Sequence, residues 1–127
     1  MNKAHRLWRH WTASTEGELA RRKESRSREL GGSRCCDVQP RQRAVVAGPL
    51  RSVTLRPKAG APALEAELGD GSGIVTLIWL GRRQIAGVHA GTWMRAAGMV
   101  CEQDGRRVIY NPRYEIRPGA PQTVEQA

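Results

Sequence analysis

The sequence lacks several features that would place it in common functional classes. It contains no phenylalanine, and its 127 residues include only four tryptophans and two tyrosines. The longest strongly apolar run, residues 74–80, is too short to cross a membrane, and no uninterrupted apolar segment follows the basic start. We therefore expect a soluble, cytoplasmic protein without a membrane span or a secretory signal.

Cysteine and histidine are scarce as well, with three of each. Cys35 and Cys36 are adjacent and cannot readily pair with each other, so with Cys101 they give an odd count and no disulfide framework. This pattern favours a reducing compartment. Neither a Cys-x-x-Cys nor a His-x-x-x-His spacing occurs, so we expect no metal site and no cofactor.

Catalytic motifs are also missing. The glycine-rich segment at residues 69–73 (GDGSG) lacks the Lys-Ser/Thr pair of a phosphate-binding loop and leads into a strand, so it is interpreted as a turn. No combination of base, nucleophile and oxyanion donors can be assembled from the sequence. The sequence therefore predicts a protein that is not an enzyme.

Basic side chains, in contrast, are in clear excess. Lys and Arg number 21 against 12 Asp and Glu, a formal charge of +9 that favours a polyanionic partner, nucleic acid first. An anionic membrane surface and charge that only maintains solubility remain the alternatives. Residues 1–34 contribute nine basic and four acidic side chains, a net +5. They are interpreted as a basic extension, in which the capping-box spacing of Thr15 and Glu18 predicts a helix over 16–30.

Residues 35–117 are predicted to form one domain, followed by a polar tail at 118–127. Alternating and apolar runs predict strands at 43–57, 63–68, 74–80, 92–101 and 106–116. Gly48-Pro49 should bend the first strand, and Pro112 should interrupt the last one. Residues 81–88 are expected to form a single helical turn. These elements predict an all-β fold, a five-stranded Greek-key OB-fold barrel with a short helical turn between strands 3 and 4.

Several segments carry a family resemblance, namely 51–57 (RSVTLRP), 64–68 (LEAEL), 70–73 (DGSG), 76–83 (TLIWLGRR), 85–87 (IAG) and 108–115 (VIYNPRYE). Together they resemble a family of small actinobacterial OB-fold nucleic-acid-binding proteins. Residues 111–114 (NPRY) are also similar to the OB wedge domain of the helicase RecG. The resemblance implies binding of single-stranded or branched DNA on one face of the barrel, with no catalytic residues.

An OB-fold usually binds its ligand across the second and third strands, between the loops that follow the first and fourth strands. The predicted nucleic-acid-binding residues are accordingly Arg56, Lys58, Trp79, Arg82, Arg83, Trp93, Arg95, Arg106 and Arg107. Basic side chains contact phosphates and aromatic rings stack on bases.

Other roles remain open for several of these residues. Trp79 either stacks on a base or fills the core, and Trp93 with Arg95 either forms a cation and aromatic patch or packs under the N-terminal helix. Arg82 and Arg83 form either a phosphate clamp or a solvated turn.

Two acidic and two further aromatic side chains are also expected near this predicted site. Glu65 and Glu67 either repel phosphate or pair with arginines across the sheet. Tyr114 is expected to close the barrel, and Tyr110 either does the same or stacks on a base.

The sequence thus predicts a non-enzymatic protein that binds single-stranded or branched DNA with little sequence preference. RNA is the alternative ligand. A protein partner is a further alternative, in which the domain is an interaction or accessory module of a larger complex.

Overall fold

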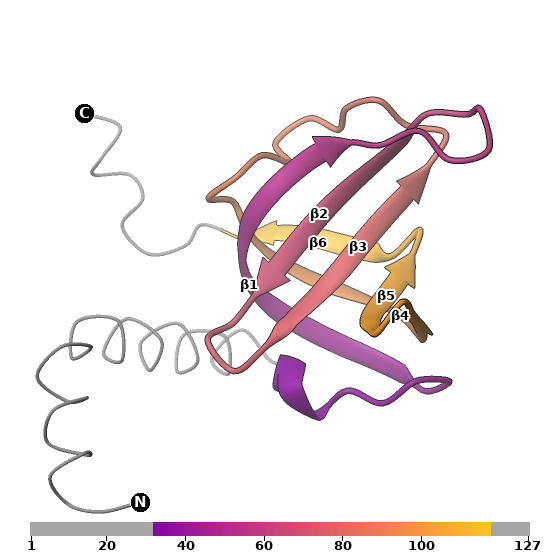
Figure 1. Ribbon diagram of the computed structural model, residues 1–127. Helices are drawn as coiled ribbons and strands as arrows, with labels where there is room; N and C mark the ends of the chain where they lie inside the picture. The colour runs from indigo at the N-terminus through magenta and orange to yellow at the C-terminus, as the bar shows by residue number, and fades with distance from the viewer. Residues whose placement is uncertain (1–31, 118–127) are drawn as a thin grey trace, which may run out of the picture.

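The computed structural model describes residues 32–117, and within this range the chain is all-β (Figure 1). Its elements are the 3-10 helix η1 (Cys35–Asp37) and the strands β1 (Arg43–Leu55), β2 (Ala63–Gly69), β3 (Ile74–Leu80), β4 (Trp93–Gln103), β5 (Arg106–Tyr110) and β6 (Arg113–Arg117). The helix expected over residues 16–30 and the polar tail lie outside the described residues.

Five of the strands close into a ring in the order β1, β2, β3, β5, β4 and back to β1. All neighbours in this ring are antiparallel except β3 and β5, which run parallel from the pair Thr76 and Val108 to the pair Ile78 and Tyr110. Strand β6 lies outside the ring and extends the sheet along β4. The predicted all-β class with five ring strands is therefore confirmed.

The ring closes because β1 is long enough to pair with two different strands. Its first half, up to Pro49, pairs with β4, and its second half, from Leu50, pairs with β2. The register shifts between Leu50 and Ser52, directly after the Gly48-Pro49 step. A proline has no N–H for a ladder, so a change of partner is favoured at this step. The predicted bend in the first strand is confirmed.

The predicted helical turn at residues 81–88 is not formed. The segment between β3 and β4 consists of turns, one of which is closed by a hydrogen bond from the Val88 N–H to the Ile85 carbonyl at 3.0 Å. Gly81 and Gly87 adopt positive φ values of 77° and 81°. This left-handed backbone conformation is incompatible with a right-handed helical turn, and it explains the correction.

The predicted last strand is divided into β5 and β6 at Asn111-Pro112. Asn111 has a φ of 48°, a left-handed conformation that asparagine tolerates better than most residues. Its N–H donates to the Ile78 carbonyl at 2.7 Å, and its Oδ1 accepts from the Leu80 N–H at 2.9 Å. Asn111 therefore continues the contact with β3 at the point where the strand breaks.

The main core fills the inside of the ring. Its largest fully buried apolar side chains are Leu50, Leu68, Leu77, Met94, Ile109, Val46, Val75 and Val100. A smaller cluster of Ala63, Ile78 and Val108 lies on the outer face of β2, β3 and β5, packed against Tyr110. The Tyr110 hydroxyl donates to the Gln103 Oε1. Both faces of β3 are therefore covered in its middle, whereas Ile74 and Leu80 at its two ends are 40% and 45% exposed.

A buried carboxylate joins η1 to the β2–β3 turn. Asp70 is 1% exposed; its Oδ2 accepts from the Cys35 N–H at 2.9 Å, and its Oδ1 accepts from the N–H and the hydroxyl of Ser72 at 2.9 and 2.7 Å. Burial acts to raise the pKa of Asp70, but the hydrogen bonds from Cys35 and Ser72 outweigh it and lower the pKa below its ordinary value of 3.8. Asp70 is therefore ionised at neutral pH.

Within residues 32–117, no helix is both long and apolar enough to span a membrane.

Candidate functional site

A groove of about 640 Å³ lies on the outer face of the ring, between the β1–β2 loop and the β4–β5 hairpin. Its lining residues are Leu55, Arg56, Pro57, Lys58, Glu65, Glu67, Asp104 and Arg106. Three of the predicted binding residues thus meet in one place, although Arg106 is 50 positions from Arg56 along the chain. They meet because in the ring a single strand, β3, separates β2, which follows the first loop, from β5, which follows the hairpin.

Glu65 organises the centre of this groove. It points outward from β2 and is only 7% exposed, because two arginines lie over it. Its Oε2 is 3.5 Å from Arg56 Nε and 3.2 Å from Arg106 Nη1. The side chains of Arg56 and Arg106 nevertheless remain 63% and 40% exposed. A guanidinium has five N–H donors, so both arginines keep donors for an anionic ligand.

The groove is not uniformly basic. Its three basic side chains face three acidic ones, Glu65, Glu67 and Asp104. Of the two roles open for the glutamates, Glu65 pairs with arginines across the sheet. It neutralises part of their charge but also fixes their position. Asp104 is a lining residue that the sequence reasoning missed; its place in the hairpin after the fourth predicted strand was the available signal.

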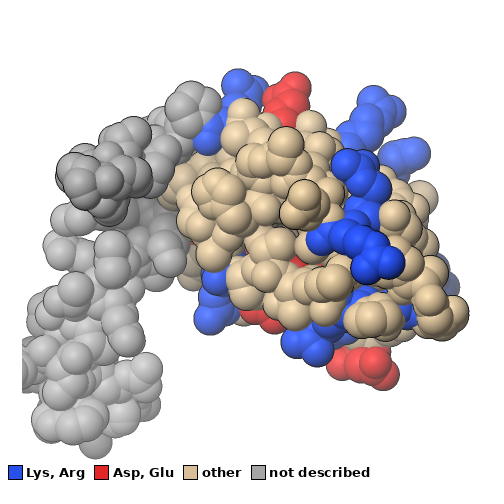
Figure 2. All heavy atoms as spheres, turned by 90° about the horizontal axis from the view of Figure 1, so that it is seen from above, with Lys and Arg blue, Asp and Glu red and all other residues tan. Residues whose placement is uncertain are grey.

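The β3–β4 segment adds further positive charge next to the β1–β2 loop. The Gly81 N–H donates to the Pro62 carbonyl at 2.8 Å. This hydrogen bond joins the start of the β3–β4 segment to the end of the β1–β2 loop. Arg82 and Arg83 follow directly and are exposed. In Figure 1 these two connections lie together at the top of the molecule, and Figure 2, viewed from that end, shows Lys and Arg side chains gathered along one side.

Trp79 does not lie on the outer face. It points into the ring, is 4% exposed and forms an edge-to-face contact with Tyr114 at a centroid distance of 5.6 Å. Its Nε1 is buried without a hydrogen-bond partner. Of the two roles left open for Trp79, the structure places its ring in the core, so its inclusion among the residues that stack on bases is corrected. Tyr114 packs against it from β6 at the end of the ring.

The remaining predicted residues lie away from the groove. Neighbouring residues of a strand point to opposite faces, so Arg107 points away from Arg106, and its Nε donates to the Val38 carbonyl at 2.7 Å. Trp93 and Arg95 lie on β4, in the part that pairs with β6. Trp93 is 9% exposed, so it does not present a ring face for stacking. The nine predicted residues thus fall into several separate places.

Of the protein-family models and the curated proteins compared with this chain, none matches it.

Proposed function

We propose that the ring is an OB-fold and that the protein binds single-stranded DNA in the groove between Arg56 and Arg106. The strand order supports the first part, because an OB-fold is a five-stranded Greek-key barrel whose β2–β3 face lies between the loops after β1 and β4. Membership of the nucleic-acid-binding family that the sequence motifs resemble is part of the same proposal.

The observation that supports the proposal most directly is that Glu65 forms ion pairs with two arginines of the groove, Arg56 and Arg106. Both guanidinium groups are fixed on one side by a carboxylate and open to solvent on the other. A fixed guanidinium loses less side-chain entropy when it binds a phosphate oxygen, and it can donate two parallel hydrogen bonds.

The rim of the groove adds Lys58, and the adjoining segment adds Arg82 and Arg83. None of these three forms an ion pair with a carboxylate of residues 32–117. A backbone of phosphates therefore meets unneutralised charge along the rim, whereas the other charged lining residues, two arginines and three acidic side chains, carry no net positive charge. Because Trp79 and Trp93 are buried, we expect electrostatic contact to dominate over stacking, with little sequence preference and strong salt dependence.

The test is fluorescence anisotropy of labelled single-stranded DNA, matched RNA and duplex over a range of salt concentrations. The double variant Arg56→Ala and Lys58→Ala should bind the single strand more weakly, and the slope of log K against log salt should fall by about 1.4, as expected for two lost phosphate contacts. Tighter binding of the RNA than of the DNA would reassign the ligand.

Glu65→Gln serves as a control with the opposite sign. It keeps an acceptor oxygen for the arginines and removes one negative charge from the groove. We expect the single strand to bind about threefold more tightly, from the repulsion of two charges about 7 Å apart in water. If the wild type binds none of these nucleic acids at low salt, the proposal is wrong and the domain is better regarded as a protein-interaction module.

A further inference from the structure

A second basic surface lies outside the groove, on the outer side of the sheet formed by the first half of β1, β4 and β6. Residues paired across these strands point to the same side, which places Arg43, Arg95, Arg113, Glu115 and Arg117 together. We call these five residues the arginine face. With four arginines and one glutamate, it carries a formal charge of +3, whereas the lining of the groove sums to zero.

Two arginines of this face are partly neutralised and two are not. Glu115 Oε1 is 3.1 Å from Arg117 Nη2 and 3.8 Å from Arg95 Nη1, so it serves both. Arg43 and Arg113 are exposed and form no ion pair within the described part of the chain. Of the formal charge of +3, Arg43 and Arg113 therefore contribute +2, and the group of Arg95, Arg117 and Glu115 contributes +1.

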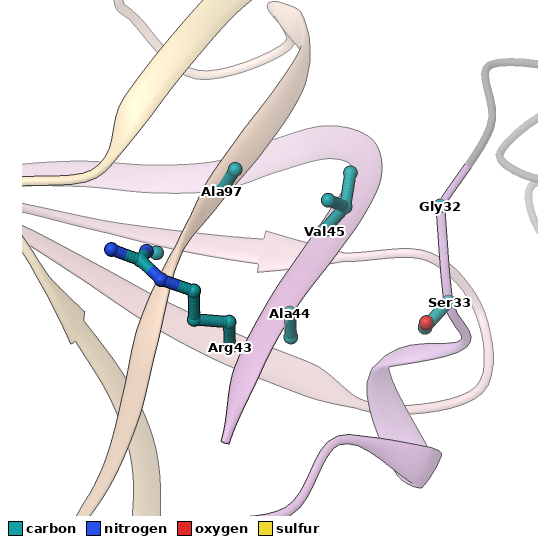
Figure 3. A pocket seen from close by; sticks show the side chains of 7 residues that line it. Gly32, Ser33, Arg43, Ala44, Val45 and Ala97 are labelled. Atoms are coloured by element: carbon teal, nitrogen blue, oxygen red, sulfur yellow. The ribbon is translucent and has the colours of Figure 1, made fainter. Parts of the chain in front are cut away.

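The strand register places these two arginines within reach of one extended anion. Arg113 pairs with Ala97, which pairs with Val45, two residues beyond Arg43. Strands are about 4.8 Å apart and rise about 3.3 Å per residue, which gives a Cα separation of about 12 Å. Figure 3 shows the Arg43 side chain crossing the strand that carries Ala97, beside a hollow of about 540 Å³ between Gly32 and β4.

The face offers charge but no stacking platform. Its aromatic residue, Trp93, is buried, and the large apolar side chain that the face exposes is Met99. A single strand gains affinity from base stacking on aromatic rings, which this surface does not provide. Contact by charge alone favours a duplex, since a duplex carries one phosphate per about 1.7 Å of axis, twice the density of one strand.

From this charge, register and lack of exposed rings, we propose that the arginine face is a second nucleic-acid contact that binds the phosphate backbone of duplex DNA. This inference rests on the proposed function, in which the groove holds a single strand. Together the two surfaces fit a ligand with both a single-stranded and a duplex part.

Anisotropy titrations with a labelled single strand, a blunt duplex and a forked duplex test this inference. Arg43→Ala with Arg113→Ala should reduce the salt slope for the fork by about two, so that between about 50 and 200 mM salt this variant loses about tenfold less affinity than the wild type. Its affinity for the single strand should stay unchanged. Arg56→Ala with Lys58→Ala removes the same net charge, and it should weaken binding of the single strand.

The two proposals fail in different ways. Equal losses for strand and fork in the Arg43 and Arg113 variant, or no loss for either, would overturn the second contact and leave the groove standing. Absence of any wild-type binding would remove the proposed function itself. Binding of phosphatidylserine vesicles that depends on Arg43 and Arg113, without an effect on the fork, would assign the face to a lipid surface and overturn the inference.

Discussion

The substitution Asp70→Asn tests how much the buried carboxylate contributes to the fold. The variant keeps the shape of the side chain but replaces one oxygen by an NH2 group. Whichever way the amide turns, this group faces backbone N–H donors, either that of Cys35 or those of Ser72 and Gly73. At least one buried or partly buried N–H then lacks an acceptor.

The expected loss follows from these contacts. One unsatisfied buried donor costs about 1 to 3 kcal/mol, and the change from a charged to a neutral acceptor in the remaining bonds costs about 1 kcal/mol more. We therefore expect the free energy of unfolding to fall by about 2 to 4 kcal/mol. For a domain of this size, such a loss lowers the melting temperature by about 10 to 25 °C.

Urea and thermal unfolding measure this loss, with Glu67→Gln as the matched control. Glu67 is half-buried, and within residues 32–117 no hydrogen bond or ion pair involves its side chain, so its variant should change the unfolding free energy by less than about 0.5 kcal/mol. A loss in Asp70→Asn no larger than that of the control would refute the anchoring role of Asp70.

The pH dependence gives a second readout of the same anchor. The folded-state pKa of Asp70 is lowered, so its contribution is fully present above its ordinary value of 3.8 and is lost as the pH falls through the folded-state value. The wild type should therefore lose more stability than Asp70→Asn on acidification below about pH 4. Parallel pH profiles for the two proteins would contradict the lowered pKa.

Two further predictions concern other residues that the tertiary structure singles out. Asn111→Gly keeps the left-handed backbone and loses only the side-chain hydrogen bond to Leu80, so it should lower the free energy of unfolding by about 1 kcal/mol. Asn111→Ala also adds backbone strain and should lower it by about 2 to 3 kcal/mol. Equal losses of the two variants in urea unfolding would show that the backbone conformation is unimportant. Burial, and to a smaller extent the charge of Asp70, raises the pKa of the Cys35 thiol far above its ordinary value, while Cys36 is exposed. An alkylating reagent should therefore modify Cys36 and leave Cys35 unmodified until urea is added. Mass spectrometry of peptides measures this, and labelling of Cys35 in the native protein would contradict its burial.

The sequence by itself determined the strand pattern of this domain. Alternation in residues 63–68 predicted Leu64, Ala66 and Leu68 on the inner face, and all three belong to the core cluster inside the ring. The Gly48-Pro49 bend and the break at Pro112 were also predictable, because proline cannot donate to a ladder wherever it occurs. These are local properties of the backbone and of side-chain periodicity.

Only the tertiary structure decided which side chains meet. Trp79 lies in a run of apolar residues without alternation, so periodicity does not show which face of the strand it is on. The pairing of β3 with β2 and β5 decides that its side chain points into the ring. The contact of Glu65 with Arg56 and Arg106 depends on the ring order, which brings together strands that are distant in the chain. The arginine face likewise exists because β6 pairs with β4, and a pairing between strands is a property of the whole sheet that no single segment encodes.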